Sequence, residues 1–222
     1  MREFIEIEAI AAQRKGGDAA LQRLLDTPTS PADLAKQPLS NWLEAMARAI
    51  FQAGFSWSVI EAKWPGFQKA FDQFDVNRVA FYRDEDTDRL LSDKAIVRNG
   101  AKIASVIDNA RFLLKLEGET GDASRYIADW PAEDHSGLVD LFARKGSRLG
   151  GLTGQRVLRV MGKDGFVLSL DVCRRLVEEG VIDKPPSSKR AMTAVQAAFN
   201  AWHRQSGRPL TQISQILAMS VS

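Results

Sequence analysis

The sequence has a single cysteine, two histidines and no long apolar run. Cys173 cannot form a disulfide within the chain, which is typical of proteins that stay in a reducing cytoplasm. No stretch approaches the roughly 18 consecutive apolar residues that a membrane-spanning helix needs. The opening residues, MREFIEIEAIAAQRKGG, interleave acids with apolar residues and lack a small-residue cleavage site, so we expect no secretory signal. These absences favour a cytoplasmic chain that does not contact a membrane.

Strand signals are nearly absent too, because no convincing period-2 run and no Asn-Gly hairpin turn occur. Apolar residues instead recur at helical spacing, and Asn99 stands where an N-cap would begin a helix. We expect helices over 41–53, 84–92, 100–114, 189–204 and 210–218, with connections at 27–31, 64–66, 117–122 and 183–189. The chain is therefore predicted to be all-α, with about ten helices.

The net charge of +2 conceals an uneven distribution along the chain. Residues 1–140 hold 17 Lys/Arg against 23 Asp/Glu, whereas residues 141–222 hold 13 against 5. Between Leu141 and Lys163 there are six cations and no acid. Such segregation indicates either a polyanion partner or a solvated basic face that has no partner.

The segment RLGGLTGQRVLRVMGKDGF (148–166) predicts a helix, a tight glycine turn and a second helix. Glycine tolerates positive φ and lets the backbone approach a ligand closely, and N–H groups at a helix start attract phosphate. Glycines are also common helix C-caps, so the pentapeptide alone is weak evidence. Together with the surrounding cations, it predicts contact with a nucleic-acid backbone. The predicted DNA-binding residues are Arg148, Gly150, Gly151, Leu152, Thr153, Gly154 and Arg156.

Asp171 follows the apolar run of FVLSLDVCRRL (166–176) and precedes a cationic helical segment. Its carboxylate could cap a helix that begins near Val172. It could also act as a catalytic carboxylate beside the glycine turn. Its position in the sequence does not separate these two readings.

In order and spacing, LGGLTGQRVLRVM and FVLSLDVCRRL resemble the helix-hairpin-helix DNA glycosylases, in which an apolar segment after the hairpin ends in a catalytic Asp. Upstream, FQAGFSWSVIEAKWPGFQKAFDQFD (51–75) and AIVRNGAKIASVIDNARFLLKLEG (95–118) resemble the 3-methyladenine DNA glycosylase I branch, whose members carry QQAGLSW and IIRNRxKIxAxIxNA. The resemblance covers roughly residues 45–176.

This resemblance implies a two-lobed helical DNA glycosylase fold with a helix-hairpin-helix element. It implies one globular unit, with a central lobe over about 45–165 that ends in the hairpin at 148–162. Residues 1–44 and 166–222 would form the second lobe. The expected partner is double-stranded DNA, bound by a monomer.

The departures from the branch concern its acid and its metal. The branch has a glutamate three residues before QAG that contacts the base, and Ala49 stands there in this chain. The branch also holds zinc with two Cys and two His, whereas Cys173, His135 and His203 do not match that pattern. We expect surface or interhelical histidines, no zinc and no other cofactor, with a monovalent cation at the hairpin as the one ion left open.

Excision requires a flipped base held between aromatic or apolar walls. The resemblance makes Trp57 the first candidate wall, followed by Phe55 and Trp42, and Gln52 a partner for the base edge; core packing is the alternative for each. Asp171 is the candidate that stabilises positive charge developing on the sugar.

The predicted activity is base excision repair by a monofunctional DNA glycosylase that acts on an alkylated base. Gln155 and Arg156 occupy the positions where a lysine nucleophile would follow the hairpin, so no lyase step is expected. Two alternatives remain: a DNA-binding protein of altered specificity or without catalysis that recognises damaged or bent duplex, and a helical interaction domain.

Overall fold

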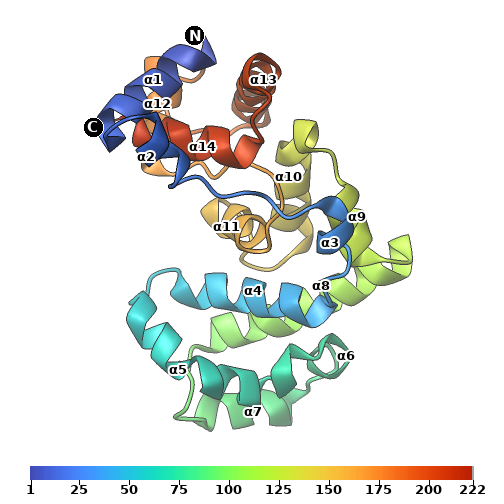
Figure 1. The fold of residues 1–222 in the computed structure, drawn as a ribbon. Coiled ribbons are helices and arrows are strands. Elements are labelled where there is room, and N and C mark those ends of the chain that lie inside the picture. The colour runs from blue at the N-terminus through green and yellow to red at the C-terminus, as the bar shows by residue number, and fades with distance from the viewer. Residues whose placement is uncertain (222) are drawn as a thin grey trace. The chain divides into compact units, whose positions relative to one another are not determined.

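The structure, a computed structural model, describes residues 1–221. These residues form α-helices and short 3-10 helices joined by turns, and this described range contains no strand (Figure 1). The predicted all-α class is confirmed. None of the described helices is long and apolar enough to cross a membrane.

The described residues divide into two compact units. Unit 1 comprises residues 1–29, 130–138 and the chain from 162 onward, and unit 2 comprises residues 30–129 and 139–161. The sequence placed residues 30–44 with the terminal segments, whereas the structure groups them with unit 2. The reason is local packing within unit 2, where Ser124 Oγ donates a hydrogen bond of 2.7 Å to the carbonyl of Gln37.

Unit 1 brings the two ends of the chain together. Its helices are α1 (Phe4–Lys15), α2 (Asp18–Gln22), η2 (Ala132–Asp134), α12 (Leu170–Glu178), α13 (Lys189–Ser206) and α14 (Leu210–Met219). Both α1 and α12 pack against α14, and α1 lies beside α14 in Figure 1. Three fully buried aromatic residues lie in its core: the ring of Phe199 contacts both the ring of Phe166 and the ring of Trp202.

Unit 2 is organised around α4. Its elements are α3 (Pro31–Leu34), α4 (Leu39–Gln52), α5 (Trp57–Ala70), η1 (Asp72–Phe74), α6 (Val76–Val79), α7 (Asp84–Ser92), α8 (Gly100–Thr120), α9 (Ala123–Asp129) and α11 (Leu152–Val160), with the later part of α10 (His135–Lys145). The apolar face of α4 packs on α8 and α11. A stack of aromatic rings, Trp64, Phe67, Phe71 and Phe74, fills the space beside α5.

Most predicted helices are confirmed with small shifts in their bounds. The helix over 84–92 has the expected bounds, and Asn99 caps α8 by accepting a hydrogen bond from the backbone N–H of Lys102. The predicted number of helices was too low, because short helices such as α2, α3 and α6 carry no long apolar period.

Two predicted connections are wrong. The turn expected at 64–66 lies inside α5, although Pro65 removes one helical hydrogen bond. Packing outweighs that loss: Trp64 is buried in the aromatic stack, and a Cβ at Gly66 would lie 2.6 Å from the carbonyl oxygen of Ala95. The connection expected at 117–122 begins too early, since α8 continues through Gly118 and ends only at Gly121, where φ is +79°.

Unit 1 contains a buried charged cluster around Arg175. Its guanidinium donates to Ser220 Oγ at 2.8 Å and to the Ser220 carbonyl at 2.5 Å, and it pairs with Glu179 at 3.4 Å. Glu179 in turn accepts hydrogen bonds of 2.8 Å from the backbone N–H and the guanidinium of Arg2. The cluster therefore ties the first residues, α12 and the end of the chain to one another.

Replacing Arg175 with Ala should lower the free energy of unfolding by about 3 kcal/mol, because Glu179 would lose a buried partner. Urea unfolding followed by circular dichroism measures the change. The control is Arg174→Ala on the same helix, whose exposed pair with Asp171 at 3.9 Å should contribute less than about 1 kcal/mol. Equal losses for the two variants would contradict the importance of the cluster.

Candidate functional site

The aromatic turn FQAGFSW connects α4 to α5 and exposes two of its rings. The chain leaves α4 at Gln52, turns at Gly54 with φ of +79°, and enters α5 at Trp57. Trp57 is 55% exposed and Phe55 is 40% exposed, which is unusual for such large apolar side chains. These two predicted wall residues are therefore accessible rather than part of the core.

A buried lysine holds the end of α4. The ammonium of Lys102 donates hydrogen bonds to the carbonyls of Ile50 at 2.7 Å, Phe51 at 3.3 Å and Ala53 at 2.5 Å. It also lies 4.6 Å from the centre of the Phe55 ring, a cation–π distance. Burial lowers the pKa of Lys102, and the guanidinium of Arg148 lowers it further.

The glycine turn is present but differs in detail from the prediction. Helix α10 ends at Lys145 and α11 begins at Leu152, so Gly154 lies inside the second helix and not in the turn. A Cβ at Gly154 would lie 2.4 Å from the Leu149 carbonyl oxygen. The backbone approaches so closely here that only a glycine fits. In the turn itself, Gly151 and Arg148 have φ of +58° and +59°.

Asn109 on α8 fixes the start of this turn. Its side-chain amide donates to the carbonyl of Ser147 at 3.0 Å, and its carbonyl oxygen accepts from the Ser147 backbone N–H at 2.7 Å. The sequence analysis assigned no role to Asn109 or Lys102. Both are polar residues within the apolar face of α8. A polar residue at such a position indicates a buried hydrogen bond, and this pattern could have identified them from the sequence.

Arg156, in the first turns of α11, brings the glycine turn next to the aromatic turn. Its guanidinium carbon lies 5.7 Å from the centre of the Trp57 ring. The predicted DNA-binding helix and the predicted base-stacking side chain are thus neighbours within unit 2. This contact also covers part of the Trp57 ring with a planar cation.

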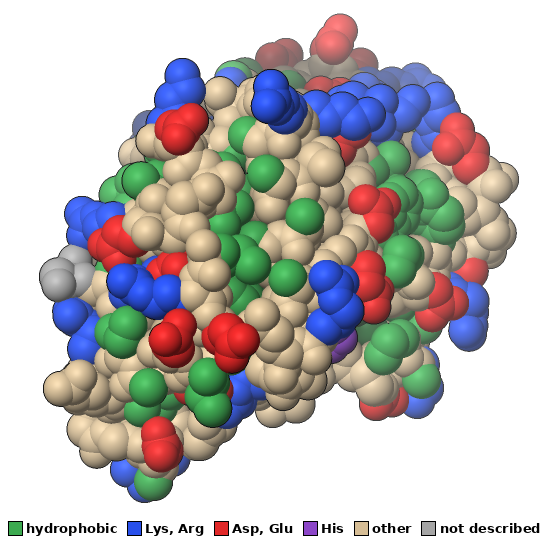
Figure 2. Space-filling view, turned by 90° about the horizontal axis from the view of Figure 1, so that it is seen from above, with side chains coloured by type: hydrophobic (Ala, Val, Ile, Leu, Met, Phe, Trp, Pro, Cys, Tyr) green, Lys and Arg blue, Asp and Glu red, His purple; other side chains and the backbone are tan. Residues whose placement is uncertain are grey.

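The cations of residues 141–163 have different surroundings. Arg144 pairs with Asp140 at 2.7 Å, and Lys163 is buried and donates to the Trp130 carbonyl. Arg148 and Arg156 are exposed, and neither forms an ion pair within residues 1–221. On the face in Figure 2, by contrast, Lys and Arg side chains are interspersed with Asp and Glu. The two unpaired arginines beside the turn are therefore free to contact an anion.

Gln52, the predicted partner for a base edge, is half-buried and bonded. Its side-chain amide donates to Glu61 Oε1 at 3.0 Å, and the other oxygen of Glu61 pairs with Arg48. Trp42, the third predicted wall residue, is fully buried in α4, which fits core packing. Its indole N–H has no hydrogen-bond partner among the described residues.

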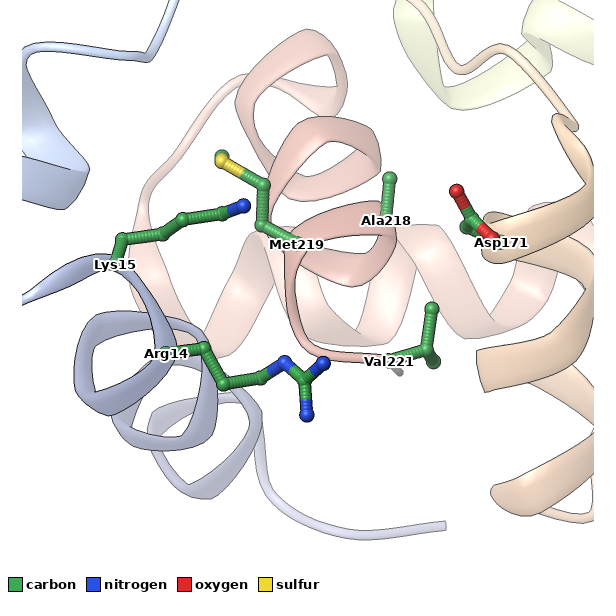
Figure 3. A pocket seen from close by; sticks show the side chains of 6 residues that line it. All are labelled: Arg14, Lys15, Asp171, Ala218, Met219 and Val221. Atoms are coloured by element: carbon green, nitrogen blue, oxygen red, sulfur yellow. The ribbon is translucent and has the colours of Figure 1, made fainter.

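Asp171 belongs to unit 1 and lies in the first turn of α12. The helix-cap reading is wrong, because Ser169 is the N-cap and its side chain accepts from the Val172 N–H. The Asp171 side chain is more than half exposed. It lines a pocket of about 490 Å³, together with the side chains shown in Figure 3. The other lining residues are Arg14, Lys15, Ala218, Met219 and Val221.

The expected surface or interhelical histidines have different environments. His135 is buried, its ring contacts Phe166 edge-on, and its Nε2 lies 3.1 Å from the Phe166 carbonyl oxygen. His203 Nδ1 lies 2.7 Å from the carbonyl oxygen of Arg208. Among the described residues, no three His, Cys, Asp or Glu side chains gather as a ligand set for a metal.

Residues 39–145 match the family model described as methyladenine glycosylase. The resemblance to the 3-methyladenine DNA glycosylase I branch is confirmed. We call residues 39–145 the methyladenine glycosylase segment. It contains α4, the aromatic turn, Lys102 and Asn109. The glycine turn and Asp171 lie beyond the matched range, so the expected roles of these residues remain predictions.

Two curated relatives match part of this chain. DNA-3-methyladenine glycosylase 1 of Escherichia coli (strain K12) is 41% identical over 66 residues, which is 30% of this chain and 35% of the relative. DNA-3-methyladenine glycosylase of Haemophilus influenzae is 29% identical over 89 residues, or 40% of this chain and 47% of the relative. The chain thus spans about one third to one half of the length of these relatives.

The solved structures that resemble this chain include two of 3-methyladenine DNA glycosylase I. One, from Staphylococcus aureus, has a TM-score of 0.49 and 23% identity, over 55% of this chain and 75% of that chain. A second has a TM-score of 0.48 and 23% identity, over 65% and 87%.

Lys102→Met should lower the free energy of unfolding by about 2–4 kcal/mol, because three carbonyls at the end of α4 lose a charged donor. The exposure of Trp57 should change at the same time. Because the chain has five tryptophans, acrylamide quenching is compared between chains with and without Trp57→Phe, and the difference reports Trp57. The matched control is Lys115→Met on the same helix, where the exposed lysine pairs with Glu119 at 3.8 Å. An equal stability for both variants would contradict the assigned role of Lys102.

Proposed function

We propose that this chain is a monofunctional DNA N-glycosylase that excises an alkylated purine, such as 3-methyladenine, from duplex DNA. The observation that carries the proposal is the contact between Arg156 and the exposed ring of Trp57. It joins a phosphate-binding helix start to a base-stacking side chain. The family match over residues 39–145 and the names of the relatives support the same chemistry.

In this proposal, the flipped base stacks on Trp57, with Phe55 beside it. An extrahelical base needs such a surface because flipping costs a few kcal/mol of lost stacking and pairing. Base–aromatic stacking returns about 1–3 kcal/mol per base. The base would stack on the part of the Trp57 ring that the Arg156 guanidinium leaves open.

The glycine turn would hold the DNA backbone next to the flipped nucleotide. Helix α11 begins directly after Gly151, so its first N–H groups and its dipole attract an anion. Arg148 and Arg156 add two charges that no acid of the described chain neutralises. Such contacts place the duplex without reading its sequence.

The reaction breaks the bond between the base nitrogen and C1′ of the sugar. The bonding electrons leave with the base, and positive charge develops on the sugar ring. We assign the stabilisation of that charge to the carboxylate of Asp171 in the DNA-bound complex. Water then adds to C1′ and loses a proton, so the hydrolysis needs no cofactor.

An alkylated purine suits the composition of this site. N3 or N7 alkylation makes the base in DNA cationic, so it leaves more readily than an unmodified base. Ala49 supplies no acid to the base, and the leaving group compensates in part for that loss. The sequence after the glycine turn has Gln155 and Arg156 rather than a lysine nucleophile, which favours hydrolysis without strand cleavage.

Asp171→Asn should reduce base release from methylated duplex DNA by about 10²–10³-fold, as expected for the loss of an electrostatic stabiliser. Duplex binding should be retained. Chromatography of the released bases measures the rate, and a gel-shift titration measures the binding. The matched control is Asp183→Asn, an exposed aspartate of the same unit, which should leave both quantities unchanged.

The same assay separates the alternatives. Duplex binding by the unmodified chain without release of any methylated, deaminated or oxidised base would favour a DNA-binding protein that lacks catalysis. Absence of duplex binding at low salt would favour a helical interaction domain.

Arg148→Ala should weaken duplex binding and reduce the slope of log affinity against log salt by about 0.9, the contribution of one phosphate contact. Titrations over a range of salt concentrations give the slope. Arg144→Ala is the control, because Arg144 already pairs with Asp140. An unchanged slope for Arg148→Ala would remove this residue from the DNA contact.

A further inference from the structure

Trp57 and Glu61 lie one turn apart on the same side of α5. Across from them, the C-terminal part of α4 contributes Arg48 and Gln52, also one turn apart. Glu61 joins the two helices, since its Oε1 accepts from the Gln52 amide at 3.0 Å and its Oε2 pairs with Arg48. Gln52 therefore lies on the side of α5 that carries the exposed Trp57 ring.

Both oxygens of Glu61 are held in place. Arg48 forms an ion pair with one of them. The Arg48 guanidinium also lies 4.1 Å from the centre of the Trp64 ring and 3.5 Å from the Glu44 carboxylate. A guanidinium held by stacking and by a second carboxylate loses little further freedom when it binds Glu61. The carboxylate of Glu61 is thus a fixed hydrogen-bond acceptor for Gln52.

A fixed acceptor determines how the amide of Gln52 is turned. A glutamine amide can normally rotate by 180° and exchange its NH2 group with its carbonyl oxygen. Beside Glu61 that rotation would place two acceptor oxygens against each other, which is unfavourable because a carboxylate accepts and does not donate. Gln52 therefore keeps its NH2 toward Glu61 and its carbonyl oxygen on the opposite edge.

We propose that Glu61 is a positioning residue that, acting through Gln52, makes the site prefer a base with an exocyclic amino group at C6. The carbonyl oxygen of Gln52 accepts a hydrogen bond from the amino group of a methylated adenine. A methylated guanine presents an oxygen at C6 and would place two acceptors together. This inference rests on the proposed glycosylase function and names the residue pair that selects the base.

The comparison that isolates this effect uses two bases with the same methyl position. Duplex DNA treated with a methylating agent contains both 3-methyladenine and 3-methylguanine, which differ at C6 in the required way. The ratio of their initial release rates cancels differences in protein concentration and in duplex binding. The ratio therefore measures how strongly the site prefers an amino group over an oxygen at C6, and it does not depend on overall activity.

In Glu61→Gln, the new amide can offer either an oxygen or an NH2 group, so Gln52 can rotate. The ratio of 3-methyladenine to 3-methylguanine release should then fall about tenfold, as expected when one hydrogen bond to the base no longer separates an amino group from an opposed acceptor. Glu61 is 47% exposed, so circular dichroism should show a folded protein. Glu119→Gln, an exposed glutamate on α8 that pairs with Lys115, is the matched control and should keep the ratio.

A second pair of variants tests whether Glu61 acts through Gln52. Gln52→Leu should also lower the ratio, and adding Glu61→Gln to it should cause no further change. The inference would be overturned if Glu61→Gln left the release ratio unchanged. It would also be overturned if Glu61→Gln lowered the ratio as much in the Gln52→Leu variant as in the unmodified chain. Either result would leave the glycosylase function intact. A complete lack of base release by the unmodified chain would overturn the proposed function, and this inference with it.

Discussion

The ammonium of Lys102 closes the end of α4, and the exposed aromatic turn depends on that contact. The last turn of a helix leaves carbonyls without helical partners, and α4 ends against α8. An ammonium has three donors and no acceptor, so it matches the carbonyls of Ile50, Phe51 and Ala53. With these groups satisfied, the chain can reverse at Gly54 and present Phe55 and Trp57 outward.

The same lysine links the aromatic turn to the glycine turn by charge. The Arg148 guanidinium contributes to the lowered pKa of Lys102, so the two cations repel each other across unit 2. Arg156 adds a third cation over Trp57. A phosphate bound at the glycine turn would offset this repulsion. The polar residue Asn109 holds the turn in the conformation that gathers these charges.

Recognition and bond breaking belong to different parts of the sequence in our proposal. The methyladenine glycosylase segment, residues 39–145, contains the aromatic turn and the Gln52–Glu61 pair. The glycine turn follows it, and Asp171 lies in unit 1. In this proposal, the residues that select the base and the residue that promotes its release can therefore change independently in sequence. Ala49, where the branch has a glutamate, is consistent with such a change.

The sequence by itself determined the all-α class, the main helices, the cap at Asn99 and the family resemblance, because apolar spacing and local capping are read from neighbouring residues. It failed at Pro65 and Gly118, where packing and helix continuation outweighed local breaking tendencies. Exposure of Trp57, burial of Trp42 and the orientation of Gln52 were decided only by tertiary structure. These properties depend on side chains that come from other helices, and a one-dimensional pattern does not contain their positions.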